Sequence, residues 1–314
     1  MSESFAIQVN GLNRSYGGFT AVQNLEFSVR EGEIFCLLGP NGAGKSTILS
    51  MLSCLLPPSA GDALLMGHSI VRAPQAVKRI IGVVPQEIAI YDDLSAHQNL
   101  VFWGRMYGLH GSRLARRVDE VLELTGLTDR RNDRAGQYSG GMQRRLNIGI
   151  ALLHEPKIVI MDEPTVGIDP QSRRRILDGV KELNGRGVTV LYTTHYMEEA
   201  QELSHRIAIM DRGRLIAQGT HGELIRTVGE LHRIRLTLSR KPAGLLEMWR
   251  MLAGVHSVND ENGTVSLLAK DSTSVLPTLF ESAARAEIHI TGMEVREPDL
   301  ESVFLHLTGS ALRD

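Results

Sequence analysis

The sequence predicts an α/β protein in which a mainly parallel sheet is covered on both faces by helices, followed by a smaller α+β domain. Short apolar runs, each long enough for one buried strand, alternate with helical segments; they are Ile34–Leu38, Lys157–Met161, Val188–Tyr192 and Arg206–Met210. Continuous apolar runs of this length are typical of parallel strands buried on both faces. From residue 226 onward the predicted order is β-α-β-β-α-β, the ferredoxin-like pattern.

The first region contains two further strands and a helical segment. Phe5–Val9 and Leu25–Val29 alternate as strands do, on either side of a diglycine turn. Apolar side chains recur at helical spacing over residues 96–136, with Arg and Glu on the other faces, so we expect helices there. We therefore place one domain at residues 1–225, with a helical subdomain at about 87–150.

The second region, residues 226–314, holds none of the chemically suggestive motifs of the first. An Asn-Asp-Glu-Asn-Gly turn between two alternating segments predicts a hairpin, and a closing helix follows Pro298. The predicted strands are Arg233–Leu238, Val255–Val258, Thr264–Leu268 and Ile288–Val295, and the predicted helices between them are Ala243–Leu252 and Ser274–Ala286. We expect this region to be a small accessory domain.

Composition limits the class of protein. The length of 314 residues suggests about two domains. The chain has 34 basic and 36 acidic side chains, and its net charge of −2 argues against a nucleic-acid partner, because such proteins usually carry a basic excess. Cys36 and Cys54 cannot form a disulfide framework, which favours a reducing, cytosolic compartment. The N-terminus does not resemble a signal peptide, and no stretch approaches the roughly 18 apolar residues of a membrane helix.

The strongest chemical signal is a glycine-rich segment between the first apolar run and a helix. Its residues are Gly39, Pro40, Asn41, Gly42, Ala43, Gly44, Lys45, Ser46 and Thr47. Successive backbone N–H groups in such a loop wrap phosphates, and glycine lets the backbone approach them closely. Lys45 would reach the β- and γ-phosphates, and Ser46 would offer its hydroxyl to Mg²⁺. A chance glycine turn is the alternative, which the flanking strand and helix disfavour.

Two adjacent acids follow the second apolar run. Because successive side chains leave a strand in opposite directions, Asp162 and Glu163 cannot perform the same task. We expect Asp162 to hold Mg²⁺ through its water shell. Glu163 would orient or deprotonate the water that attacks the γ-phosphate. The alternative is a solvated turn at the end of a strand.

Ser139, Gly140 and Gly141 precede the helix Leu146–Leu153. A hydroxyl, free backbone amides and the helix dipole together make an anion site, so this segment is a candidate phosphate contact. An ordinary N-cap formed by Ser139 is the alternative interpretation.

Together these segments resemble the nucleotide-binding subunit of ATP-binding-cassette (ABC) transporters. Gly39–Ser46 is similar to the Walker A loop of that family and Ile158–Glu163 to its Walker B strand. Tyr138–Gln143 is similar to the family signature, usually Leu-Ser-Gly-Gly-Gln, from which Tyr138 and Met142 depart. Ser139, Gly140 and Gly141 are intact, so the resemblance implies that their phosphate contact is kept.

Four single residues extend the resemblance, and they lie in the order of the family's motifs. Gln86 matches its Q-loop, Asp169 its D-loop, His195 its switch histidine and Tyr16 the aromatic that stacks on adenine. The resemblance implies that His195 donates a hydrogen bond to the γ-phosphate. It implies that Gln86 contacts Mg²⁺ or the attacking water. Alternatively, His195 is a polar loop residue and Tyr16 packs under a loop.

The resemblance implies a P-loop NTPase fold with the helical subdomain of ABC nucleotide-binding domains, and a function as an ATP-hydrolysing motor. The cofactors would be ATP and Mg²⁺. Two subunits, as a homodimer or a pair of ATPase subunits, would sandwich two ATP head to tail. Separate integral membrane permease subunits would hold this cytoplasmic chain at the inner face of the cell membrane.

The C-terminal segment Glu297–Gly309 is similar to the endings of ATPase subunits of ABC-2-type exporters of the daunorubicin-resistance group. Export is therefore the expected direction. Two alternatives remain open, namely an importer ATPase and a soluble ABC ATPase not coupled to transport. The second alternative is disfavoured because only 52 residues (139 − 86 − 1) separate Gln86 from Ser139. This is too few for the long coiled coil of the DNA-repair relatives.

Overall fold

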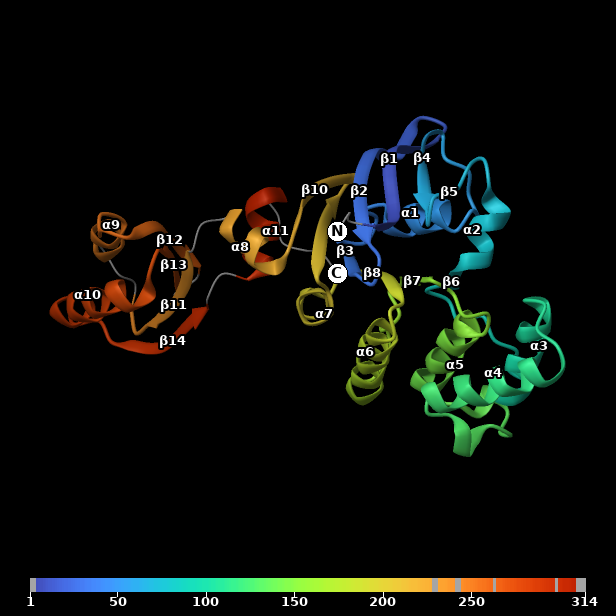
Figure 1. Ribbon diagram of the computed structural model, residues 1–314. Helices are drawn as coiled ribbons and strands as arrows, with labels where there is room; N and C mark the ends of the chain where they lie inside the picture. The colour runs from blue at the N-terminus through green and yellow to red at the C-terminus, as the bar shows by residue number, and fades with distance from the viewer. Residues whose placement is uncertain (1–3, 228–230, 241–243, 262–263, 297–298, 309–314) are drawn as a thin grey trace. The chain divides into compact units, whose positions relative to one another are not determined.

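The computed structural model describes residues 4–227, 231–240, 244–261, 264–296 and 299–308 (Figure 1). The chain forms two compact units, of which the first extends to Gly219 and the second spans Thr220–Ala311. Glu297, Pro298 and Gly309, at the two ends of the C-terminal segment that suggested an exporter, lie outside the described residues. No helix within the described ranges is long and apolar enough to cross a membrane.

The first unit begins with a four-stranded antiparallel sheet in the order β2-β1-β4-β5. Its long strands are joined by a turn at Gly17, whose φ of +57° lies in the left-handed region that glycine adopts without strain. The strands are β1 (Phe5–Tyr16), β2 (Phe19–Arg30), β4 (Ala60–Leu65) and β5 (His68–Ser69).

The second sheet of this unit has six strands in the order β10-β9-β3-β8-β7-β6. Five of them run parallel, and only β10 is antiparallel, to β9. The strands are β3 (Ile34–Leu38), β6 (Ile81–Val84), β7 (Ile158–Asp162), β8 (Thr189–Thr194), β9 (Arg206–Asp211) and β10 (Arg214–Gly219). The predicted mainly parallel sheet is confirmed, and all five side chains of β3 are buried as its continuous apolar run requires.

Helices of the first unit fall into two groups. One group follows the sheet strands: α1 (Lys45–Leu52), α2 (Pro74–Ile80), α6 (Pro170–Gly185) and α7 (Met197–Leu203). The other forms the helical subdomain: α3 (Ala96–Met106), α4 (Gly111–Leu124) and α5 (Gly140–Leu152), with short 3₁₀ turns at Thr128–Arg130 and Ala135–Gln137. Helix α3 starts with a capping box in which Ser95 and Gln98 bond each other's backbone.

The second unit contains the predicted β-α-β-β-α-β order. Its sheet order is β12-β13-β11-β14 and every pair is antiparallel, as in the ferredoxin-like fold. Its core surrounds Trp249, which is fully buried and donates from Nε1 to Ser282 Oγ at 2.8 Å. The elements are β11 (His232–Leu238), α9 (Leu245–Arg250), β12 (Val255–Glu261), β13 (Thr264–Ala269), α10 (Ser272–Arg285) and β14 (Ile290–Arg296).

The first unit ends at Gly219, which is six residues before the domain boundary predicted from the sequence (225 − 219). Helix α8 (His221–Thr227) contacts α11 (Leu300–Thr308), the closing helix, and its Leu224 is buried. The helix therefore belongs to the second unit. Its partner lies far along the chain, so local sequence pattern could not reveal the assignment.

Candidate active site

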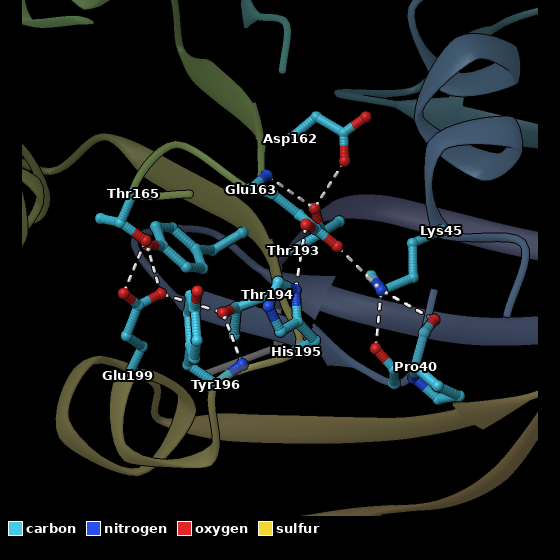
Figure 2. Close-up of polar contacts among 12 residues, drawn as sticks. Pro40, Lys45, Asp162, Glu163, Thr165, Thr193, Thr194, His195, Tyr196 and Glu199 are labelled. Carbon is cyan, nitrogen blue, oxygen red and sulfur yellow. Dashed lines mark hydrogen bonds and ion pairs between the residues drawn. The ribbon is translucent and has the colours of Figure 1, made fainter. Parts of the chain in front are cut away.

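Three neighbouring strands of the parallel sheet bring the candidate residues together. Strands β3, β8 and β7 are adjacent, and at their carboxyl ends lie the glycine-rich loop, His195 and the Asp162-Glu163 pair respectively (Figure 2). Ligands of open α/β sheets bind at this edge, outside the carboxyl ends of the strands. The sheet order therefore makes one site from segments that are far apart in the sequence.

The glycine-rich loop connects β3 to α1, whose first residues are Lys45, Ser46 and Thr47. Gly44 has φ of +95°, and a Cβ added to it would lie 2.7 Å from the carbonyl oxygen of Ala21. A Cβ on Gly39 would lie 2.4 Å from the carbonyl oxygen of Met210. Both positions therefore require glycine, and the loop presents its backbone amides at the N-terminus of a helix, where anions bind.

Lys45 is almost fully buried and its ammonium group has three partners. Nζ donates to the carbonyl oxygens of Gly39 at 2.6 Å and Pro40 at 3.0 Å. It also lies 3.0 Å from Oε1 of Glu163. Because an ammonium has three hydrogens, these contacts use its full donor capacity. A phosphate that binds Lys45 must therefore displace at least one of them.

Glu163 lies between two nitrogen groups. Its Oε1 pairs with Lys45, and its Oε2 lies 3.1 Å from Nδ1 of His195, while only 5% of the residue is exposed. Its φ is +42°, an uncommon backbone conformation for a residue other than glycine. Backbone strain of this kind clusters at functional sites, where the surrounding structure imposes it.

Asp162 and Glu163 have different partners. Figure 2 shows Glu163 reaching Lys45, whereas the carboxylate of Asp162 is bonded to Thr193. Thr193 of β8 connects the two acids, because its Oγ1 donates to Asp162 Oδ1 at 2.7 Å and accepts from the backbone N–H of Glu163 at 3.0 Å. Sequence reasoning missed Thr193, although its place beside the histidine at the end of a buried strand was a usable signal.

The signature segment forms the start of α5. Ser139 is its N-cap, and its Oγ accepts from the backbone N–H of Met142 at 3.3 Å. Ser139 and Gly140 are exposed, so both the N-cap and the anion-site interpretations are compatible with the fold. Tyr138 is buried and donates from its hydroxyl to the carbonyl oxygen of Arg130 at 2.6 Å. Burial raises the pKa of Tyr138, so the phenol stays a neutral donor.

Gln86 is exposed and lies beyond the end of β6. Side chains of α5 form hydrogen bonds with the backbone of this segment. Arg144, which is 3% exposed, donates to the carbonyl oxygens of Pro85 and Gln86. One turn later, Asn147 Oδ1 accepts from the backbone N–H of Ala89 at 3.3 Å. Sequence reasoning missed this link. Arg144 and Asn147 are three residues apart and share one face of the helix, but Gln143 and Arg145 beside them are equally polar in the sequence.

Asp169 caps α6, accepting from the backbone N–H of Ser172 at 2.9 Å. This hydrogen bond lowers the pKa of the exposed Asp169 carboxyl. The signature helix approaches the same turn closely, since a Cβ on Gly141 would lie 2.1 Å from Ser172 Oγ. The fold therefore brings the signature segment and the Asp169 turn side by side.

Tyr16 lies at the end of β1 with 46% of its surface exposed, and the guanidinium of Arg14 lies 4.6 Å from the centre of its ring. Within the described ranges, no hydrogen bond or ion pair joins the side chains of Tyr16, Gln86, Ser139 or Asp169 to the Lys45–Glu163–His195 cluster. These four candidate residues are therefore not bonded to that cluster.

Known proteins that are similar to this chain in sequence include ABC ATP-binding proteins. Residues 22–166 match the ABC transporter family. Over 310 residues the chain is 46% identical to the linearmycin resistance ATP-binding protein LnrL of Bacillus subtilis, covering 98% of this chain and 100% of that protein. It is 40% identical over 309 residues to the daunorubicin resistance ATP-binding protein DrrA3 of Streptomyces coeruleorubidus, covering 98% and 97%. The predicted resemblance to the daunorubicin-resistance group is confirmed.

The solved structures it resembles are ATP-binding cassettes. One is the dimeric cassette MJ0796 in a post-hydrolysis state bound to ADP and Pi, with a TM-score of 0.62 and 26% identity. The match covers 68% of this chain and 98% of that one, which confirms the predicted fold. The chain therefore belongs to the ABC transporter family, in which it is an ATP-hydrolysing motor subunit of the exporter type.

Proposed function

We propose that the Lys45–Glu163–His195 cluster is the hydrolytic centre of this ATPase and that Glu163 activates the attacking water. The observation that carries the proposal is the carboxylate of Glu163, buried between Lys45 Nζ at 3.0 Å and His195 Nδ1 at 3.1 Å. A buried carboxylate within reach of a phosphate-binding lysine is suited to accept a proton from water. When the γ-phosphate takes Lys45 away from Glu163, the carboxylate becomes free to do so.

Binding of ATP is assigned to the other candidate residues and to His195. Backbone amides of residues 39–47 cradle the phosphates, Tyr16 stacks on the adenine, and His195 donates to the γ-phosphate. Ser139, Gly140 and Gly141 contact the phosphates of a second ATP, which the partner's Walker A loop holds. We assign Asp169, in the exposed turn beside them, to the same interface.

Magnesium is the second cofactor of the proposal. A hydroxyl, a carboxylate and an amide oxygen, from Ser46, Asp162 and Gln86, are hard oxygen donors of the type that Mg²⁺ prefers. Within the described ranges, no group of three or more His, Cys, Asp or Glu side chains could hold a metal by itself. This fits an ion held by few protein ligands together with waters and phosphate oxygens. Bound there, Mg²⁺ would neutralise charge on the phosphates.

Two kinds of protein partner complete the proposal. A second ATPase subunit binds head to tail, which the dimeric form of the related cassette MJ0796 supports. A separate membrane permease docks on the helical subdomain, where Phe102 and Met106 are exposed beside a groove of about 450 Å³ on α3. Through this permease the chain would lie at the cytoplasmic face of the membrane.

Replacing Glu163 with Gln tests the proposal, because the amide cannot accept the proton of water. We expect Glu163→Gln to bind ATP but to lower phosphate release by about a hundredfold or more. The variant should accumulate as an ATP-bound dimer in size-exclusion chromatography. Glu198→Gln, an exposed acid on α7, is the matched control and should hydrolyse ATP normally. Near-normal turnover by Glu163→Gln would remove Glu163 from the role of base.

A further inference from the structure

A second buried carboxylate, that of Glu199 on α7, lies near the site but outside the proposed catalytic cluster. The residue is 1% exposed and accepts four hydrogen bonds. Oε1 accepts from Thr165 Oγ1 and from Arg173 Nε, both at 2.6 Å. Oε2 accepts from the Tyr192 hydroxyl and from Thr194 Oγ1, both at 2.9 Å. Glu199 is therefore a buried, fully bonded acid without a role in the proposed chemistry.

The donors to Glu199 come from the segments that carry the site residues. Thr165 lies two residues after Glu163, and Thr194 immediately precedes His195 (Figure 2). Arg173 lies in the first turn of α6, where its backbone N–H donates to the carbonyl oxygen of Asp169 at 2.8 Å. One carboxylate thus ties together the turn after Glu163, the strand that leads to His195 and the helix that follows Asp169.

Tyr196 extends this network to His195. The guanidinium of Arg173 lies 4.5 Å from the centre of the Tyr196 ring, which is itself 4.2 Å from the His195 ring. The backbone N–H of Tyr196 donates to Thr194 Oγ1 at 2.9 Å. A contiguous set of contacts therefore leads from Glu199 through Arg173 and Tyr196 to His195.

Attachment of α7 to α6 does not by itself require a buried acid. Glu202, one turn further along α7, pairs on the surface with Arg174 and Lys181 of α6, both at 2.7 Å. A buried charge is costly, and well-packed apolar residues often replace buried ion pairs without loss of stability. The value of an acid at position 199 therefore lies in directed hydrogen bonds, which fix the arrangement of the segments that it joins.

We propose that Glu199 is a positioning residue for ATP hydrolysis, which holds the turn after Glu163, the start of α6 and the His195 segment in their reactive arrangement. This inference rests on the roles proposed above for Glu163 and His195. None of the four donors to Glu199 belongs to the glycine-rich loop or to Tyr16, which carry most of the proposed contacts with ATP. Loss of Glu199 should lower kcat and leave the affinity for ATP unchanged.

The first test is Glu199→Gln in the full-length chain. This variant keeps the shape of the side chain but loses the charge that binds Arg173. We expect kcat for ATP to fall about tenfold or more, while the Kd of a fluorescent ATP analogue stays within about threefold. Glu202→Gln is the matched control, since it removes an exposed link between the same two helices, and its kcat should be unchanged. Equal kcat values for the two variants would overturn the proposal.

A conservative pair at position 165 separates positioning from stability. Thr165→Val removes the hydroxyl at nearly constant volume and should lower kcat, whereas Thr165→Ser keeps the hydroxyl and should restore it. Thermal unfolding of both variants is measured alongside. The proposal is overturned if Val and Ser behave alike, or if the loss of kcat follows the loss of Tm across all the variants. This pair also decides the matter if Glu199→Gln does not fold.

Glu163→Gln, assayed in parallel, separates failure of this inference from failure of the proposed function. Loss of turnover in Glu163→Gln, with normal kcat in Glu199→Gln and Thr165→Val, would refute the positioning role alone. Normal turnover in Glu163→Gln would refute the role of Glu163 as the base. The positioning role of Glu199 would then fail as well, because it depends on that base.

Discussion

The interiors of the two units differ in one respect. The first unit buries several charged side chains, namely Glu33, Lys45, Arg144, Glu163 and Glu199. In the second unit, the polar side chains that are buried among the described residues are Ser272 and Ser282. Both units also have an aliphatic core, so the difference concerns what is added to that core rather than how it packs.

Most of the charged residues in the interior of the first unit cluster at one edge of its sheet. Lys45, Glu163 and Glu199 all bond groups at or just beyond the ends of β3, β7 and β8. Buried charges are costly unless they are paired, and perturbed or paired ionisable groups gather at functional sites. We therefore expect substitutions of the buried charged residues in the first unit to change function, and interior substitutions in the second unit to change stability.

Trp249→Ala should produce the largest effect. Removing this fully buried ring leaves a cavity and deprives Ser282 of its donor, so we expect the second unit to lose about 3–5 kcal/mol of stability. Hydrogen exchange of peptides from residues 232–296 measures this loss. Met251→Ala, at an 85% exposed position, is the control and should change stability by less than about 0.5 kcal/mol. If Trp249→Ala also lost ATP binding, the expectation that interior substitutions in the second unit change stability alone would be wrong.

Lys45→Ala, in the first unit, should change function rather than stability. The substitution removes the cation that faces the phosphates and leaves Glu163 with His195 as its remaining partner in the cluster. We expect the affinity for ATP to fall about tenfold to a hundredfold, equivalent to about 1.4–2.7 kcal/mol, without unfolding. Isothermal titration measures the affinity, and Lys78→Ala on the exposed face of α2 is the control. Unchanged affinity would contradict the proposed phosphate cradle.

Local pattern was sufficient to predict much of both units. The buried strands appear as continuous apolar runs, and the glycine loop between strand and helix has one common structural solution. In the second unit, strict alternation and a turn-forming segment predicted the hairpin of β12 and β13. These features depend on residues that are close together in the sequence, which is why they can be recognised there.

Features that depend on distant contacts were missed. Glu198 and Glu199 look alike in the sequence, yet one is exposed and the other receives donors from three other segments of the fold. Arg144 looks like its neighbour Arg145 until β6 places the Gln86 segment beside it. Only contacts with distant segments decide which member of each pair is buried, so the local sequence does not distinguish them.

The smallest predicted effect concerns a histidine in each unit. Burial lowers the pKa of His154 in the first unit and of His221 in the second. Nε2 of His154 lies 2.8 Å from the carbonyl oxygen of Ile81, and its ring stacks on that of Tyr107 at 4.2 Å. The hydrogen bond to Ile81 raises its pKa and the nearby Arg117 lowers it, but burial is the larger cause.

Acid should therefore weaken both units. Above about pH 6.5 these histidines are neutral in the folded and unfolded chain alike, so they contribute no pH dependence. Below that pH the unfolded chain takes up the proton first, and the free energy of unfolding decreases until the folded-state pKa is passed. Urea unfolding at about pH 7.5 and about pH 5.5 measures the loss. His154→Gln, which can keep a donor to Ile81, should reduce the acid sensitivity of the first unit, and His221→Gln that of the second. If either variant changed the acid sensitivity of the other unit instead, the two interiors could not be treated as separate.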